Sequence, residues 1–194
     1  MNNGIWSVKT ASRKHKCDIA LADTIGSIYP IQMSMADLGC GIGSYCKILR
    51  DKYQWQNVIG YEGTVGVSNL QNAYDKILFC DLTKEIELIR PFQMVLCLEV
   101  GEHIPKEFEQ VFLNNVTKMS GNNLIISWAY PGQGGTGHVN ELDQNYVYSQ
   151  LTQRGFEIDN DKTHELRIKS EFKWFRKNIM AMRSLVTANG NPPK

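Results

Sequence analysis

The stretch Asp37-Leu38-Gly39-Cys40-Gly41-Ile42-Gly43 joins an apolar run to an amphipathic one. The residues that lead into it, Met35–Leu38, favour a buried strand, and residues 43–53 carry apolar side chains at helical spacing. Glycines between a parallel strand and a helix leave bare backbone at the carboxyl end of a sheet, where α/β folds bind cofactors. A tight turn without a ligand explains the glycines as well. The neighbouring residues therefore have to distinguish a cofactor site from a simple turn.

The turn does not complete the dinucleotide-binding fingerprint. Either frame of GxGxxG needs a third glycine or alanine at a position where the chain has Ser44 or Cys46. Asp37, two residues before the first glycine, would repel a pyrophosphate, whereas its carboxylate suits a cationic ligand. S-Adenosylmethionine, which has an ammonium and a sulfonium group, is such a ligand.

Two further strands are expected to end in an acid. Glu62 closes the run Val58-Ile59-Gly60-Tyr61-Glu62, at about the spacing from the glycines at which a carboxylate meets a ribose. Asp81 follows the next run, Phe79-Cys80. Because parallel strands end at one edge of a sheet, the three acids are expected to lie at the same edge.

These residues resemble the class I S-adenosylmethionine-dependent methyltransferases, from the glycine turn to about Arg183. Leu98-Glu99-Val100-Gly101-Glu102-His103-Ile104-Pro105 is similar to the family segment LEVxEHIP. The resemblance implies that Asp37 and the glycines Gly39, Gly41 and Gly43 line the methionine part and that Glu62 binds the ribose. It further implies that Asp81 and Leu82 hold the adenine, that Leu98, Glu99 and Val100 border the cofactor, and that S-adenosylhomocysteine is the product.

The rest of the chain alternates short apolar runs with amphipathic ones, as in an α/β sheet. Strands are expected at 35–38, 57–62, 77–80, 92–98, 123–128, 156–159 and 178–183, and helices at 19–28, 43–53, 65–74, 82–89, 106–119 and 141–154. The resemblance implies a three-layer α/β/α Rossmann-like sandwich, with a mostly parallel seven-stranded sheet and an antiparallel last strand. We expect an N-terminal helical segment that covers the site (1–30), the cofactor-binding domain (31–186) and a flexible tail (187–194).

Methyl transfer needs a base only when the acceptor carries a proton. His138 follows four glycines in six residues and is the first candidate for a general base; His103, after the fourth strand, is the second. A helix cap explains His138 as well, and a backbone hydrogen bond explains His103. The four histidines are dispersed, without an HxxxH or Cys/His pairing, so no required metal ion is expected.

Nucleic acid is not the expected substrate. The chain of 194 residues has a formal net charge of +1, and its local basic stretch, Lys162–Arg183, has aromatic residues that also suit a core. The chain has two basic ends: this stretch, and an N-terminal group made of Lys9, Arg13, Lys14 and Lys16. From these two ends we infer an anionic acceptor. A small molecule or a sugar fits a chain with little material beyond the core fold.

Five cysteines without a CxxC pair indicate a reducing cytoplasm, and neither a signal peptide nor a membrane anchor is expected. Two other functions stay open from the sequence. A Rossmann-type oxidoreductase would bind a nicotinamide cofactor, and an inactive regulatory module would bind S-adenosylmethionine without turnover. The sequence leaves the methylated atom and the oligomeric state open.

Overall fold

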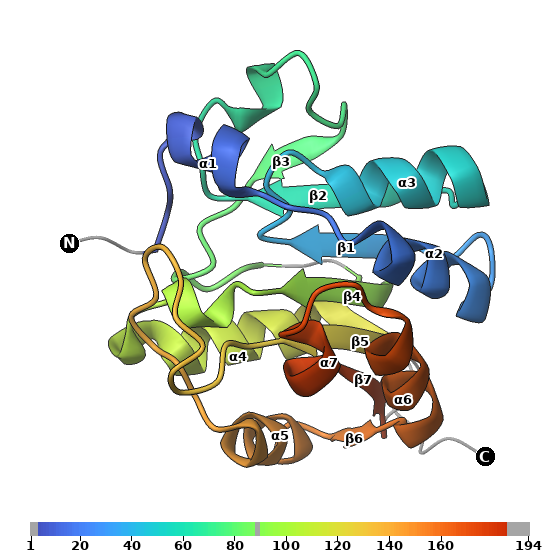
Figure 1. Cartoon of the computed structure of the whole chain (residues 1–194), viewed down its shortest axis with the longest axis vertical. Helices are drawn as coiled ribbons and strands as arrows, with labels where there is room; N and C mark the ends of the chain where they lie inside the picture. Colours follow the sequence, from blue (N-terminus) through green and yellow to red (C-terminus); the bar gives the residue numbers. More distant parts are fainter. Residues whose placement is uncertain (1–3, 88–89, 186–194) are drawn as a thin grey trace.

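The computed structural model describes residues 4–87 and 90–185, and within them the chain forms a seven-stranded sheet (Figure 1). Its strands are β1 (Met35–Leu38), β2 (Val58–Glu62), β3 (Ile77–Phe79), β4 (Phe92–Leu98), β5 (Ser120–Ser127), β6 (Phe156–Ile158) and β7 (Met180–Ser184). They lie in the order β3-β2-β1-β4-β5-β7-β6, and β7 runs antiparallel to both of its neighbours. The expected Rossmann-like sheet with an antiparallel last strand is confirmed.

Helices cover both faces of the sheet. They are α1 (Val8–Lys14), α2 (Ile19–Ile28), α3 (Ser44–Tyr53), α4 (Glu109–Met119), α5 (Gln144–Thr152), α6 (Asn160–Lys169) and α7 (Phe175–Asn178), with the 3-10 turns η1 (Val67–Asn69), η2 (Gly101–His103) and η3 (Lys106–Phe108). Residues of α2, α3, α6 and α7 form one core cluster with the sheet, and residues of α4 and α5 form the other. The sheet is therefore the middle of three layers.

The central strands are apolar on both faces because both faces are covered. Along β4, Met94 and Leu96 pack into the cluster of α2 and α3, while Val95 and Cys97 pack into the cluster of α4 and α5. All four side chains are fully buried. This explains why β4 reads as a continuous apolar run in the sequence, without the alternation of a half-exposed strand.

The helix predicted over residues 65–74 is wrong. Within that range only η1 is helical, and its N-cap, Gly66, has a φ of +85°. A left-handed residue at this position ends any continuous α-helical path from residue 65. The segment instead forms a compact turn in which the Tyr74 hydroxyl donates to the carbonyl of Val58 on β2, at 2.9 Å.

The helix predicted over residues 82–89 is also wrong for residues 82–87, which the structure describes as turns and irregular chain. The side chain of Asn115 on α4 takes the hydrogen bonds that a helix would use. Its amide donates to the carbonyls of Leu82 and Lys84, and its oxygen accepts from the N–H of Ile86. A tertiary contact thus replaces the helix that the apolar spacing predicted.

Within residues 4–87 and 90–185, no helix combines the length and the apolar character that a bilayer crossing requires. The tail expected at 187–194 lies outside the described residues. The carboxyl ends of the parallel strands lie toward the left in Figure 1, beside α1 and the loop that follows β5. That edge therefore brings the N-terminal segment and this loop close to the glycine turn.

Candidate functional site

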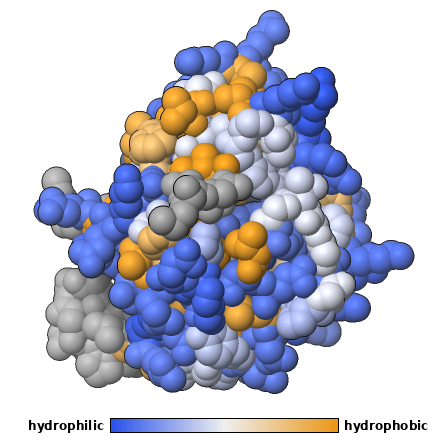
Figure 2. Space-filling view, turned by 90° about the vertical axis from the view of Figure 1, so that its left-hand side faces the viewer, coloured by the Kyte–Doolittle hydropathy of each residue, from blue (hydrophilic) through white to orange (hydrophobic). Residues whose placement is uncertain are grey.

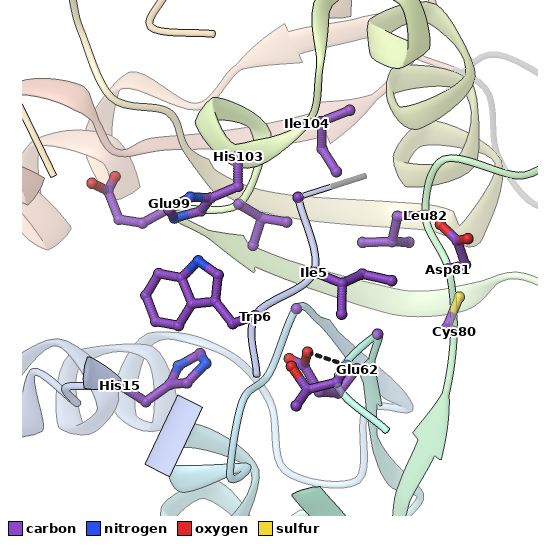
Figure 3. Close-up of a pocket in the computed structure, with 15 residues that line it drawn as sticks. Ile5, Trp6, His15, Glu62, Cys80, Asp81, Leu82, Glu99, His103 and Ile104 are labelled. Carbon is purple, nitrogen blue, oxygen red and sulfur yellow. Dashed lines mark hydrogen bonds between the residues drawn. The ribbon is translucent and has the colours of Figure 1, made fainter. Parts of the chain in front are cut away.

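A cavity of about 560 Å³ lies at the carboxyl edge of the sheet (Figure 3). Six of the residues that the sequence predicted for the cofactor line it: Gly39, Glu62, Asp81, Leu82, Glu99 and Val100. They come from the ends of β1 to β4, so the parallel sheet gathers side chains that are distant in the sequence. Two other predicted residues, Asp37 and Leu98, line the adjoining larger cavity instead, and Gly41 and Gly43 line neither of the two.

Glu62 ties the end of β2 to the glycine turn. One carboxylate oxygen accepts from the N–H of Gly41 and the other from the N–H of Thr64, both at 2.8 Å. The side chain is almost buried, at 9% exposure. Each oxygen has a second lone pair, so the carboxylate holds the turn and can still accept from hydroxyl groups of a ligand.

Asp37 is a buried acid at the end of β1. It is 3% exposed, and its Oδ2 lies 3.5 Å from the thiol of Cys46 on α3. Burial raises the pKa of the Asp37 carboxyl to about 7, and the charge of Glu62 adds to the effect. A cation placed beside Asp37 would lower that pKa and so would be bound.

Two glycines of the turn are required by close neighbours as well as by their backbone angles. Gly39 has a φ of +72°, and a Cβ there would lie 2.5 Å from Cγ2 of Val100. Gly41 has a φ of +57°, and a Cβ there would lie 2.3 Å from the imidazole of His15. The turn therefore has glycine partly because β4 and the N-terminal segment approach its backbone.

Asp81 and Leu82 follow β3 on the far side of the cavity. The Asp81 carboxylate accepts from both the N–H and the hydroxyl of Thr83, at 3.1 and 2.6 Å. Leu82 is 7% exposed and packs with the core beneath α4. An acid beside an apolar side chain suits a flat ring that carries an amino group.

Glu99 leaves β4 in a left-handed conformation, with a φ of +54°. Its carboxylate accepts hydrogen bonds from Ser127, Gln133 and Asn178. A non-glycine residue in this region is strained, and such strain is retained where neighbouring contacts hold it. The three donors come from β5, the following loop and α7, so Glu99 joins these elements at the cavity.

The N-terminal segment supplies four lining residues that the sequence did not single out: Gly4, Ile5, Trp6 and His15. In Figure 3 the indole of Trp6 lies between the imidazoles of His15 and His103, with ring-centroid distances of 5.4 and 5.0 Å. Burial lowers the pKa of His15, which favours its neutral form. Only the expectation that residues 1–30 cover the site pointed to this segment.

A second cavity, of about 1240 Å³, adjoins the first and shares Trp6, His15, Gly39, Glu99 and His103 with it. Lys14 and Lys16 line one part of it, and an aromatic group, Phe172, Trp174 and Phe175, lines another. The rings of Phe172 and Trp174 are 4.6 Å apart. This cavity therefore combines positive charge with flat apolar surface.

The two candidate bases lie side by side on the wall of the larger cavity. The rings of His103 and His138 meet edge to face, with their centroids 5.1 Å apart. Nδ1 of His103 lies 3.1 Å from the carbonyl oxygen of Gly137, and Nδ1 of His138 lies 2.9 Å from Oε1 of Glu141. Burial lowers the pKa of His103 to about 4. Glu102, which the sequence did not assign a role, is buried behind both rings.

Comparison with known proteins gives a clear result for structure only. No protein-family model and no curated protein sequence matches the chain. A TehB-like S-adenosylmethionine-dependent methyltransferase from Corynebacterium glutamicum has a TM-score of 0.64 at 16% identity, over 91% of this chain and 92% of its own. The fold is that of the class I S-adenosylmethionine-dependent methyltransferases.

Two other solved methyltransferases have this fold. The magnesium protoporphyrin IX methyltransferase from Synechocystis, solved with bound S-adenosylhomocysteine, has a TM-score of 0.60 at 17% identity, over 91% of this chain and 83% of its own. A sugar N-methyltransferase from a Streptoalloteichus species has a TM-score of 0.63 at 14% identity, over 88% of this chain and 89% of its own. At these identities the likeness to the class I methyltransferases establishes the fold, and activity has to be argued from the site.

Proposed function

We propose that this chain transfers a methyl group from S-adenosylmethionine to a small-molecule or sugar acceptor. The observation that carries the proposal is the cavity at the carboxyl edge of the sheet, which gathers Gly39, Glu62, Asp81 and Leu82 around one space. The neighbours with this fold include methyltransferases solved with the methyl donor or its product.

The residues of the two adjoining cavities together fit the parts of this cofactor. The buried carboxyl of Asp37 gains from the ammonium group, and the free lone pairs of Glu62 accept from the ribose hydroxyls. Asp81 and Leu82 hold the amino group and the ring of the adenine. The bound cofactor supplies a methyl group that is activated by its positive sulfur, so this chain has to position the acceptor and exclude water.

A nicotinamide cofactor fits the same residues poorly. Its pyrophosphate would have to approach the glycine turn, where Asp37 and Glu62 both carry carboxyl groups at low exposure. Desolvated like charges repel strongly, and no lysine or arginine is among the residues that line the smaller cavity. The acids therefore favour the methyltransferase over the oxidoreductase.

The larger cavity is our candidate site for the acceptor. Lys14 and Lys16 suit a carboxylate or phosphate, and the rings of Phe172 and Trp174 suit a flat or sugar-like body. The face of the molecule that contains this edge is mostly hydrophilic in its described parts, with apolar residues in small groups (Figure 2). This distribution supports a small acceptor over a broad apolar partner.

His138 is the proposed general base when the acceptor carries a proton. The carboxylate of Glu141 can only accept, so Nδ1 of His138 holds the hydrogen and its Nε2 presents a lone pair. His103, neutral at pH 7 because burial lowers its pKa to about 4, supports the imidazole of His138 edge to face. We place both histidines on the acceptor side of the cofactor.

The proposal also assigns the N-terminal segment as the cover of both cavities. Trp6 and His15 line both spaces, which supports a covering role.

The proposal places the protein in the cytoplasm. All five cysteines are free thiols, and burial raises the pKa of Cys17 to about 12 and of Cys80 to about 11. Unpaired, protonated thiols are typical of a reducing compartment.

Calorimetric titration with S-adenosylhomocysteine tests the cofactor site directly. We expect saturable binding to the full chain, at least about tenfold weaker binding to Glu62→Ala, and no binding of NADH. Glu165→Ala on α6, which lines neither cavity, is the matched acid-to-alanine control and should bind like the parent chain. Binding of NADH alone would favour the oxidoreductase. Binding without methyl transfer to any acceptor in an anionic small-molecule panel would favour the regulatory module.

A further inference from the structure

Three side chains that can bind a metal ion meet beside the two cavities. Glu102 and His103 belong to η2, directly after β4, and His138 belongs to the loop after β5. One ligand atom from each lies within 4.8 Å of the others, and Nε2 of His138 is 3.9 Å from Oε1 of Glu102. Because β4 and β5 are paired in parallel, the segments that follow them emerge at one edge and bring these residues together.

Glu102 is the unusual member of this group. Its side chain is fully buried, and neither carboxylate oxygen has a hydrogen-bond partner among the described residues. Glu99, three residues earlier, accepts from three donors. Burial, with the charge of Glu99 adding to it, raises the pKa of the Glu102 carboxyl well above its ordinary value, so the neutral form is favoured in the ion-free protein.

The backbone holds Glu102 in this position. Its carbonyl oxygen accepts from the N–H groups of Val139 and Asn140, at 2.8 and 3.0 Å, which fastens the loop of His138 to η2. Asn140 is held in turn, because its side chain donates to Glu109 at 3.0 Å and its carbonyl accepts from Trp128 at 2.7 Å. The meeting of Glu102 and His138 is thus fixed by two paired main-chain segments.

Both histidines are held in the tautomer that metal binding needs. The carbonyl of Gly137 and the carboxylate of Glu141 only accept hydrogen bonds, so Nδ1 of each imidazole carries the hydrogen. The lone pair of each ring is then on Nε2. Glu141 is itself fixed by the N–H groups of Gly132 and Gly134, both at 2.8 Å. A carboxylate or carbonyl behind each histidine is the usual outer shell of a metal site.

We propose that Glu102, His103 and His138 bind a divalent first-row transition-metal ion. Two imidazoles and one carboxylate favour ions such as Mn²⁺, Fe²⁺, Co²⁺ or Zn²⁺ over Mg²⁺, which prefers oxygen ligands. Bonds of about 2.0–2.2 Å place ligand atoms about 3 Å apart. The three groups therefore have to approach one another by about 1–2 Å, which side-chain rotation supplies.

The ion has an open side toward the larger cavity, because His103 and His138 line that cavity and Glu102 lies behind them. On the proposed function, this is the acceptor side. A bound cation lowers the pKa of a coordinated hydroxyl and fixes its position. The site thus selects an acceptor that presents an oxygen, and in the metal-bound protein Nε2 of His138 is a ligand and not the proton acceptor.

Titration of the chelator-treated full chain with MnCl₂ tests the site without any methyl donor. We choose Mn²⁺ as the probe because the cysteine thiolates compete for Zn²⁺. We expect one equivalent to bind, followed as the loss of the free-ion electron paramagnetic resonance signal, and equimolar Mg²⁺ not to displace it. Glu102→Gln and His138→Gln should each weaken binding by about 100-fold or more, whereas Glu141→Gln should weaken it by about tenfold.

His164→Gln, a histidine exposed on α6, is the matched control and should bind like the parent chain. Glu102→Gln keeps the size and shape of the buried side chain, so we expect it to fold; His138→Gln changes a loop residue and tests the same site independently. Absence of Mn²⁺ binding, or equal binding by both variants, overturns the proposal. S-Adenosylhomocysteine titrated in parallel separates the outcomes, because none of its proposed contacts, Asp37, Glu62, Asp81 and Leu82, belongs to the metal site. Its binding without Mn²⁺ binding leaves the proposed function intact.

Discussion

Asp37 couples cofactor binding to pH. In the ligand-free protein the pKa of its carboxyl is about 7, raised chiefly by burial, and the ammonium of the ligand favours the ionised form. Protons therefore compete with the ligand as the pH falls. We expect the affinity for S-adenosylhomocysteine to fall about tenfold for each pH unit below about 7 and to level off above pH 8. Calorimetric titration between pH 5.5 and 8.5 measures this profile.

Asp37→Asn is the matched variant because it keeps the shape of the side chain and removes its titration. We expect weaker binding that no longer follows this pH profile. In the parent protein, stability is lost as the pH rises from the ordinary value of 3.8 to about 7, since only the unfolded state ionises freely over that range. The variant should therefore unfold at a higher temperature than the parent at pH 8. An unchanged affinity profile in the variant would assign the pH dependence to another group.

Single residues differ in how far the sequence predicted them. The acids Asp37, Glu62 and Asp81 were found because each ends a strand, and parallel strands end at one edge. Glu102 was missed because an acid in a turn is ordinarily solvated, and its burial follows from the loop that the β5 end places over it. The contact between His103 and His138 likewise depends on a loop conformation that spacing along the chain does not specify.

Asp18 joins two elements that are far apart in the sequence. Its buried carboxylate accepts from the N–H of Leu21, at the start of α2, and from the N–H groups of Glu171 and Phe172, at 2.8 and 2.9 Å. Asp18→Ala leaves three backbone donors unpaired, one of them buried and two partly buried. We expect the free energy of unfolding to fall by about 3 kcal/mol in urea denaturation.

Asp143→Ala is the control for helix capping alone. Asp143 is exposed and caps α5 through one bond to the N–H of Asn145, at 2.8 Å. Its removal should cost about 1 kcal/mol. Equal losses for the two variants would mean that the long-range bonds of Asp18 contribute nothing. Phe172 lines the larger cavity, so the Asp18 variant should also bind the acceptor less tightly.

The N-terminal segment should contribute more to binding than to stability. Within α1 only Ala11 is buried, yet Trp6 and His15 line both cavities. A chain that begins at Lys16 should therefore keep most of its resistance to urea and bind S-adenosylhomocysteine at least about tenfold more weakly. Trypsin cleavage at Lys14 and Lys16 of the full chain should slow when the ligand is bound. Unchanged cleavage together with unchanged affinity would contradict a covering role.

The sequence predicted the bounds of a helix or strand correctly where the local residue pattern alone determined that element. The strands Met35–Leu38 and Phe92–Leu98 have the predicted bounds, because each run is mostly apolar and most of its side chains are buried. The helix expected at 65–74 did not form, because Gly66 adopts a left-handed angle. Residues 82–87 of the helix expected at 82–89 are not helical, because Asn115 takes the backbone groups of Leu82, Lys84 and Ile86. Side-chain contacts from another element overrode the apolar spacing.

At the scale of the whole molecule, the antiparallel last strand came from the resemblance and not from periodicity. Spacing predicts seven strands and leaves open which neighbours they have. The position of β7 between β5 and β6 was not predicted and comes from the structure. This order matters for function because it keeps β1, β2 and β4 adjacent, so that their ends surround one cavity.

The whole molecule should be stabilised by its cofactor, because the cavity is formed only when distant strands are assembled. At a ligand concentration of about 100 times Kd, binding to the folded state alone adds about 2.7 kcal/mol. For a chain of this size the unfolding temperature should then rise by about 5–10 °C. Differential scanning calorimetry with S-adenosylhomocysteine, with NADH and with neither compares the two cofactor classes in one experiment. A rise with NADH alone would contradict the methyltransferase, whereas a rise with S-adenosylhomocysteine that Glu62→Ala abolishes and Glu165→Ala retains ties the stabilisation to the end of β2.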